Sequence, residues 1–211
     1  MRLDHLAVIA PTLEEGVAHV YDCLGVDMPI GGKHPLMGTH NHLMRIGEDV
    51  FLEVIAVDPD APGPDRARWF GFDDPDAVRA DWDAGLRLKS WVVRTDDLEA
   101  ILKVHGELLG QAIHLTRGNL AWDFAVRPDG ALPMAGAVPC VMDWGPAGTP
   151  VGRMADLGVR LTCFVLEHPK AEHIQSLYSE LGVETGPDVV PGPVVRYRAW
   201  FDAPSGQREL S

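Results

Sequence analysis

Residues 3–15 read LDHLAVIAPTLEE, and this segment decides the fold of the chain. Residues 3–10 are mostly apolar, which is typical of a short buried strand, and they include one ring side chain, His5. Pro11 then turns the chain. Thr12 and Glu15 form a capping box, in which the two side chains satisfy backbone N–H groups at the start of a helix. The segment therefore predicts a strand that leads directly into a capped helix.

The same strand-then-helix pattern occurs twice more along the chain. A strand at 88–94 precedes a helix start at 96–99, and a strand at 159–166 precedes a helix start at 168–169. The first and third helices also share the ending Leu-Gly-Val. Such a repeat predicts units that each leave one half-apolar sheet face, and these faces must close against one another around a cavity.

We predict an α+β fold in which repeated β-α-β-β-β units form curved mixed sheets around a central pocket, with the helices outside. All units belong to one compact domain. The expected segments are a first β-α-β-β-β unit at 1–57, an aromatic and proline-rich insert at 58–85, a second β-α-β-β-β unit at 86–145 and a third, shorter β-α-β-β unit at 159–211. The insert is expected to lie over a surface groove, because it is unusually rich in aromatic side chains for a linker.

The composition argues against two classes of binding partner. The chain has 211 residues, 46% of them hydrophobic, and a formal net charge of −13. This charge argues against a nucleic-acid surface, which needs a basic stripe, and against docking on anionic membranes. The three cysteines are scattered and form no CxxC pair, so a reducing, cytoplasmic location is expected. We expect neither a signal peptide nor a membrane helix, since no apolar run approaches the ~20 residues that a span needs.

Several short motifs together carry a family resemblance. They are LDHLAV (3–8), GKHPLMGTHN (32–41), FLEVIA (51–56), RWFG (68–71), PCVMDW (139–144) and PSG (204–206). With them the chain resembles the vicinal oxygen chelate superfamily, which contains glyoxalase I, extradiol dioxygenases, methylmalonyl-CoA epimerase and the bleomycin- and fosfomycin-resistance proteins. More narrowly, it is similar to the glyoxalase-like domain family, which has no single known reaction. The resemblance is specific for the fold and weak for the activity.

The resemblance implies a metal site with one ligand from the first strand and one from the last strand of each unit. His5 and Glu53 fall on these positions in the first unit. Ser90 or Thr162 stands where a second histidine or glutamine is expected, and Glu209 is a candidate third oxygen donor. Imidazole and carboxylate suit Zn, Mn, Ni or Fe(II), but such sites use at least three protein ligands. A metal-free pair, either functional or purely structural, therefore remains an alternative.

Two histidines on the third predicted strand depend on its register. His40 and His42 lie two residues apart and so share one face of the sheet. A two-residue turn at 47–48 would place His42 opposite Glu53, as a third ligand or as the group that moves a proton, with His40 among the substrate-binding residues. A three-residue turn would instead pair Leu43 with Glu53 and direct both histidines to the other face.

Five further residues are predicted to contact a substrate or to move a proton. His34 lies in a Gly/Pro-rich loop and has the unperturbed pKa of ~6.5 that suits acid–base catalysis. Thr39 and Asn41 follow on the rim, where Asn41 could donate to a substrate carbonyl. Trp91 and Trp122 lie on predicted strands and could line an apolar pocket, although such aromatics are more often core residues.

These residues together favour a metal-dependent lyase or isomerase that acts on a small, oxygen-rich substrate. A divalent ion on His5 and Glu53 would stabilise an enediolate-type anion, while His34 or His42 moves the proton. One alternative is a metal-free protein that sequesters a small molecule, as the resistance proteins of the superfamily do. Another is an extradiol-type dioxygenase. The expected partners are a small-molecule ligand and a second copy of the chain in a homodimer.

Overall fold

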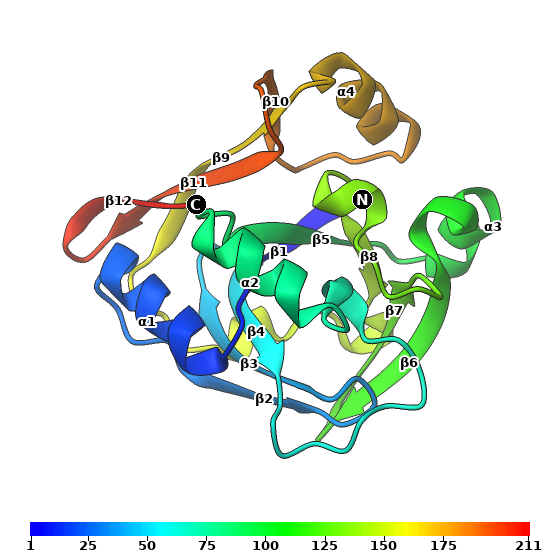
Figure 1. Ribbon diagram of the computed structural model, residues 1–211, viewed down its shortest axis with the longest axis horizontal. Helices are drawn as coiled ribbons and strands as arrows, with labels where there is room; N and C mark the ends of the chain where they lie inside the picture. Colours follow the sequence, from blue (N-terminus) through cyan, green and yellow to red (C-terminus); the bar gives the residue numbers. More distant parts are fainter.

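The computed structural model describes all 211 residues as an α+β fold with two sheets (Figure 1). The first unit contains β1 (Arg2–Ile9), α1 (Leu13–Leu24), β2 (Ile30–His34), β3 (Thr39–Arg45) and β4 (Phe51–Val57). The insert contains α2 (Pro75–Asp83). The second unit contains β5 (Leu88–Arg94), α3 (Leu98–Leu109), β6 (Gln111–Arg117), β7 (Leu120–Val126) and β8 (Cys140–Asp143). The third contains β9 (Arg160–His168), α4 (Ala171–Glu180), β10 (Asp188–Pro191), β11 (Arg196–Ala203) and β12 (Gly206–Leu210).

The first two units combine into one eight-stranded mixed sheet, in the order β2-β3-β4-β1-β5-β8-β7-β6. The first strands of the two units, β1 and β5, run antiparallel at its centre, and each has the last strand of its own unit as a parallel neighbour. The sheet curves until its edge strands β2 and β6 approach each other, so it is nearly closed (Figure 1). The predicted fold class is confirmed, and the first unit pairs with the second.

Local sequence signals account for the helix boundaries. Thr12 caps α1 by accepting a hydrogen bond from the backbone N–H of Glu15 (3.2 Å), as its capping box predicts. Gly25 ends the helix at φ 68°, a left-handed conformation that glycine adopts without steric cost. In α3 the cap is Asp97, one residue after the expected start. None of the helices has the length and apolar run required to cross a bilayer.

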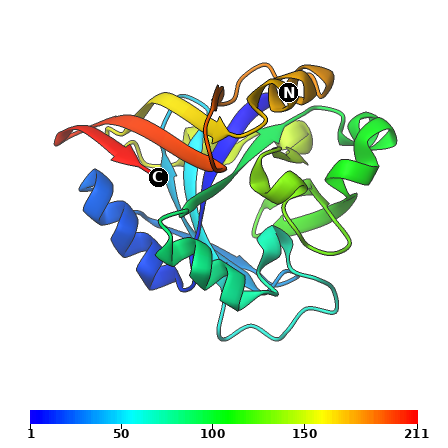
Figure 2. The ribbon, with the colours of Figure 1, turned by 45° about the horizontal axis from the view of Figure 1, so that its top comes forward.

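The third unit forms a separate four-stranded sheet in the order β10-β9-β11-β12. Here the strand after the helix, β10, pairs directly with the first strand of its unit, β9, whereas two other strands separate β2 from β1 and β6 from β5 in the large sheet. The third unit is therefore not a topological copy of the first two. It packs over the outer side of the large sheet, with β11 near β5 and β12 near α1 (Figure 2).

Two hydrophobic clusters divide the core between them. The larger, with 35 buried residues, includes side chains of the helices and of the third unit, together with Trp91 of β5. The smaller, with 17 buried residues, fills the concave side of the large sheet. It includes Trp69, Phe70 and Phe72, so the aromatic part of the insert packs inside the curved sheet rather than over a surface groove. The concave side therefore becomes a closed, largely aromatic interior.

Candidate functional site

The concave side of the large sheet encloses a cavity of about 30 Å³, room for about one or two water molecules. Its polar lining residues are His5, His34, Asn41, Glu53 and Arg117. Its apolar lining is mostly aromatic and consists chiefly of Trp69, Phe70, Trp122, Phe124, Met142 and Trp144. Apart from Arg117, the polar side chains come from the first unit, while the aromatic side chains other than Phe51 come from the insert and the second unit.

A β-bulge in β1 gives the cavity wall two adjacent polar residues. The pairing of β1 with β5 shifts register between Leu3 and His5. Leu3 and Leu6 both belong to the larger core cluster, so the two residues between them, Asp4 and His5, do not follow simple alternation. Bulges of this kind re-aim side chains beside active sites. Here the bulge allows the carboxylate of Asp4 to contact the ring of its own neighbour.

His5 lies between two buried carboxylates. Its Nδ1–H donates to Oδ1 of Asp4 (2.8 Å), its Nε2 lies 3.4 Å from Oε2 of Glu53, and its ring stacks on Phe51 with centroids 4.4 Å apart. Burial acts to lower the pKa of His5, but the hydrogen bonds and charges of Asp4 and Glu53 outweigh it and raise the pKa from 6.5 to about 9. The ring is therefore an imidazolium near neutral pH.

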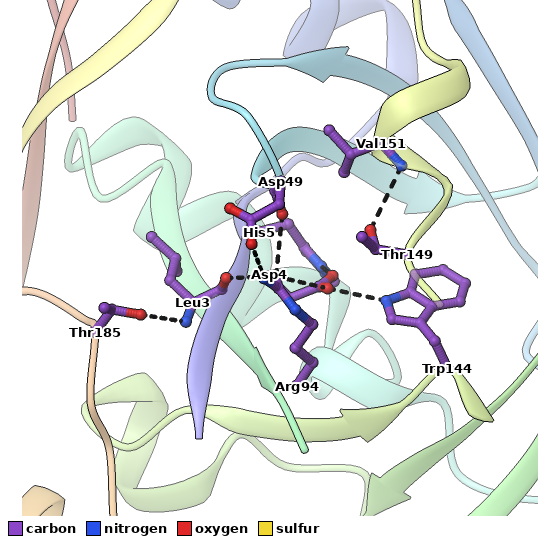
Figure 3. Close-up of polar contacts among 9 residues, drawn as sticks. All are labelled: Leu3, Asp4, His5, Asp49, Arg94, Trp144, Thr149, Val151 and Thr185. Carbon is purple, nitrogen blue, oxygen red and sulfur yellow. Dashed lines mark hydrogen bonds and ion pairs between the residues drawn. The ribbon is translucent and has the colours of Figure 1, made fainter. Parts of the chain in front are cut away.

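Asp4 is fixed from the side opposite His5. Trp144 donates from its indole Nε1 to Oδ2 of Asp4 (2.9 Å), and Arg94 Nη1 lies 3.5 Å from the same oxygen (Figure 3). Arg94 is itself held by Asp49 and by the backbone carbonyl of Leu3. Asp4 has no exposed surface, and these partners satisfy the buried charge that orients His5.

Glu53 continues the chain of polar contacts toward the edge of the sheet. Asn41 donates from Nδ2 to Oε1 of Glu53 (2.6 Å), and Arg117 donates from Nη1 to Oδ1 of Asn41 (3.2 Å). Burial acts to raise the pKa of Glu53, but the His5 hydrogen bond and charge, with a smaller contribution from Asn41, lower it overall. Glu53 is thus an ionised carboxylate inside an apolar cavity.

His34 is a neutral ring on the same wall. Trp69 donates from Nε1 to Oγ1 of Thr39 (3.2 Å), and this hydroxyl lies 3.1 Å from Nδ1 of His34. Nε2 of His34 lies 3.4 Å from Nη1 of Arg117. Burial, with a further contribution from the positive charge of Arg117, lowers the pKa of His34 from 6.5 to about 4. His34 is therefore uncharged when His5 is charged.

Comparison with known proteins gives the family. The sequence profile described as "Glyoxalase-like domain" matches residues 3–182. The chain belongs to this family. No curated protein sequence matches this glyoxalase-like chain.

Three solved structures are similar to the chain at low sequence identity. A hypothetical protein from Staphylococcus aureus aligns with a TM-score of 0.58 and 12% identity, over 92% of this chain and 87% of the other. Methylmalonyl-CoA epimerase from Mycobacterium tuberculosis aligns with a TM-score of 0.41 and 14% identity, over 68% and 87%. Methylmalonyl-CoA epimerase from Streptomyces coelicolor aligns with a TM-score of 0.41 and 12% identity, over 71% of this chain and 96% of the other. At such identities the likeness concerns the fold alone.

The structure brings together part of the predicted site of this glyoxalase-like protein. His5, His34, Asn41, Glu53 and Trp122 line the cavity, and Thr39 lies directly behind His34. In β3, Leu43 pairs with Glu53, so the three-residue-turn alternative is the one adopted. This corrects the placement of His40 and His42, which lie on the opposite face, where Nδ1 of His42 contacts the carbonyl oxygen of Met28 (2.7 Å).

Two other expectations about position are also corrected. Trp91 is fully buried against Phe164 and Tyr178, beneath the third unit, and does not line the cavity. Thr162 is exposed on β9, and Glu209 on β12 pairs with Arg198, so neither candidate ligand from the third unit reaches the site. The physical reason is the different strand order of the third unit, which keeps it outside the curved sheet.

The residues present do not make a full site for the divalent metal that the fold family implies. His5 and Glu53 face each other, and Asp4 orients His5 as carboxylates orient metal-binding histidines. At the equivalent place in the second unit, however, Ser90 lies beside Cys140, a thiol whose pKa burial raises to about 12. No group of three histidine, cysteine, aspartate or glutamate side chains converges to hold an ion. A third ligand from this set is therefore lacking.

Two residues of the site, Asp4 and Arg117, were not predicted from the sequence. Strand alternation places Asp4 on the face opposite His5, and only the bulge brings the two together. Arg117 ends β6, far from the first unit in sequence, and it reaches Asn41 because the sheet curves until its edges meet. The adjacency of an aspartate and a histidine in LDHLAV was the one visible signal for Asp4; no local signal marked Arg117.

Proposed function

We propose that this protein is a metal-independent isomerase or lyase that removes a proton from the carbon next to a carbonyl group of a small organic molecule. The observation that carries the proposal is the contact between His5 and Glu53, 3.4 Å apart on the wall of a buried cavity. A carboxylate can accept a proton from carbon, and an imidazolium can stabilise the oxygen that becomes negative.

Glu53, His5 and Asp4 have separate roles in this reaction. Glu53 accepts the proton while the electron pair of the C–H bond moves into an enolate, whose oxygen accepts a hydrogen bond from Nε2–H of His5. Asp4 holds the ring in the orientation that presents Nε2. Return of the proton to a different carbon gives an isomer, and departure of a leaving group from the adjacent carbon gives elimination. The aromatic wall excludes water, which strengthens both interactions.

The polar wall is less suited to extradiol-type oxygenation. That chemistry needs two histidines and one carboxylate on a single iron ion. His42 points away from Glu53, and Nε2 of His34 faces the guanidinium of Arg117 rather than Glu53. A positive charge beside the second histidine opposes the binding of a metal cation there.

A second candidate function is simple sequestration of a small molecule. The closed aromatic wall, with the Trp122 and Trp144 rings 5.5 Å apart, favours it. Sequestration requires burial and shape but no proton transfer. The two functions therefore differ in whether a bound ketone exchanges its acidic protons.

Proton exchange with solvent tests the proposed reaction without knowledge of the natural substrate. Purified protein is treated with a chelator and incubated in D₂O with small ketones, and the loss of the C–H signals next to the carbonyl is followed by proton NMR. We expect exchange above background that Glu53→Gln reduces by about 10²- to 10⁴-fold. Glu209→Gln, an exposed glutamate paired with Arg198, is the matched control and leaves the exchange unchanged. Equal exchange in wild type and Glu53→Gln would contradict the proposal.

A further inference from the structure

An outer groove adjoins the cavity at the seam of the curved sheet. It has a volume of about 320 Å³, within the range of small-molecule sites. The groove and the cavity share Leu43, Arg117 and Pro150 in their linings, so they meet at these residues. The cavity has room for only a small reactive group, and the rest of a ligand must therefore lie in the groove.

The groove contains two arginines and no carboxylate. Arg117 and Arg153 line it together with apolar and neutral side chains. Arg117 bonds only to the neutral groups Asn41 and His34, and Arg153 forms no ion pair. Arg127, by contrast, pairs with an aspartate 2.9 Å away. In a chain with a net charge of −13, two cations without acidic partners in one groove form a local site for an anion.

The backbone makes room for one of these arginines. The side chain of Arg117 crosses from β6 over Gly32 of β2, where an added Cβ would lie 2.9 Å from Cδ of Arg117. Two features favour glycine at this position: side chains rarely adopt its backbone angle φ of 158°, and Arg117 occupies the space that a Cβ would need. Gly32 therefore acts as a positioning residue that lets Arg117 reach both the groove and Asn41.

The apolar part of the groove is open to solvent. Ile30 on the edge strand β2 is 81% exposed, an unusual state for so large an apolar side chain, and it lines the groove beside Leu43 and Leu120. Carbon chains or rings of a ligand would cover this surface on binding. The groove thus offers apolar contact along its walls and two guanidinium groups for an acidic end.

We infer that the ligand of this protein is a small organic acid whose carboxylate or phosphate binds Arg117 and Arg153 in the outer groove. Its apolar body lies on Ile30, and its carbonyl end enters the cavity at Glu53. Guanidinium groups bind carboxylate and phosphate through paired, charge-assisted hydrogen bonds. The inference rests on the proposed function for the reaction at Glu53, whereas anion binding in the groove is independent of it.

Ligand-observed NMR titrations test the inference with three ketone probes. The probes are 4-oxopentanoate, its neutral isostere 4-oxopentanamide, and 2-oxopropyl phosphate. We expect the acid to bind about tenfold more tightly than the amide, since a hydrogen bond to a charged group is worth that much in affinity. The stronger of the two acids identifies which oxyanion the groove prefers. Equal affinity of the acids and the amide for the wild-type protein would overturn the inference.

Substitutions locate the binding site. Arg117→Gln and Arg153→Gln should each reduce the preference for the acid, and Gly32→Ala should do so without any change of charge. Arg208→Gln, whose arginine bonds only to a backbone carbonyl on β12, is the control and should retain the preference. Retention of the preference in both groove variants would contradict the assignment. Acid preference without proton exchange would overturn the proposed reaction alone, and exchange without acid preference would overturn the groove alone.

Discussion

Nδ1 of His5 lies 2.8 Å from Oδ1 of Asp4, the residue immediately before it in the chain. Neighbouring residues of a strand normally point to opposite faces, so this contact depends on the bulge in β1. It presents Nε2 of His5 to Glu53 and keeps the ring charged. The interior of the curved sheet thereby combines a base and a hydrogen-bond donor in one small cavity.

Asp4→Asn should lower the pKa of His5, because the neutral amide no longer stabilises the imidazolium. It should also lower the free energy of unfolding by about 1–3 kcal/mol, since Trp144 and Arg94 lose a charged acceptor. NMR titration of the His5 ring and urea unfolding measure the two effects. Asp123→Asn, which removes an exposed carboxylate 2.8 Å from His114, is the matched control. An unchanged His5 pKa in Asp4→Asn would show that Asp4 does not stabilise the imidazolium of His5.

The raised pKa of His5 predicts a pH-dependent stability. A group whose pKa is higher in the folded than in the unfolded chain stabilises the fold fully below its unfolded value and loses that contribution as the pH rises through its folded value. For His5 these values are 6.5 and about 9, so the contribution, on the order of 3 kcal/mol, declines between them. Urea unfolding at pH 6 and pH 9.5 should show this decline in the wild type and less of it in Asp4→Asn. A parallel pH dependence of the two proteins would contradict the assignment.

His42→Ala should leave proton exchange unchanged, because the ring contacts the carbonyl of Met28 on the face opposite Glu53. His34→Ala should reduce exchange, since its ring lines the cavity and contacts Arg117 and Thr39. Rates of deuterium incorporation for both variants, with circular dichroism to check folding, measure the contrast. The reverse order of effects would mean that the two-residue-turn register exists in solution.

The third unit should contribute stability rather than chemistry. Tyr178 donates to the carbonyl of Ala137 (2.5 Å) and Tyr197 to that of Gly136 (2.6 Å), and these bonds attach the third unit to the segment between β7 and β8. Tyr178→Phe should lower the free energy of unfolding by about 1 kcal/mol, because a buried carbonyl loses its donor. Thermal and urea unfolding measure this, and proton exchange at the cavity should remain at the wild-type rate. A selective loss of exchange without loss of stability would place the third unit in the reaction.

Part of the site could be predicted because it depends on local patterns. His5 and Glu53 lie on strands whose apolar runs are visible in the sequence, and the strand-helix repeat indicates that these strands share one sheet. The sequence did not decide on which face of the sheet His42 lies, because a change of one residue in the turn before β4 reverses that face. Arg117 could not be predicted, because its place depends on the closure of the whole sheet.

The different topology of the third unit has a similar cause. Its helix pattern matches that of the first unit, but β10 pairs directly with β9, whereas two strands separate β2 from β1. A hydrophobic stripe specifies that an element is buried, not which strand becomes its neighbour. The expectation that Thr162 corresponds to His5 failed for this reason.

Metal content is the measurement that tests the central claim most directly. Wild-type protein and His5→Ala, purified without a chelator or a polyhistidine tag, are incubated with Zn²⁺, Mn²⁺, Ni²⁺ and Fe²⁺, desalted and examined by elemental analysis. Because only His5 and Glu53 face each other as ligands, we predict that neither protein retains stoichiometric metal. Near-stoichiometric metal in the wild type that disappears in His5→Ala would contradict the account, because it would show that His5 binds a metal ion.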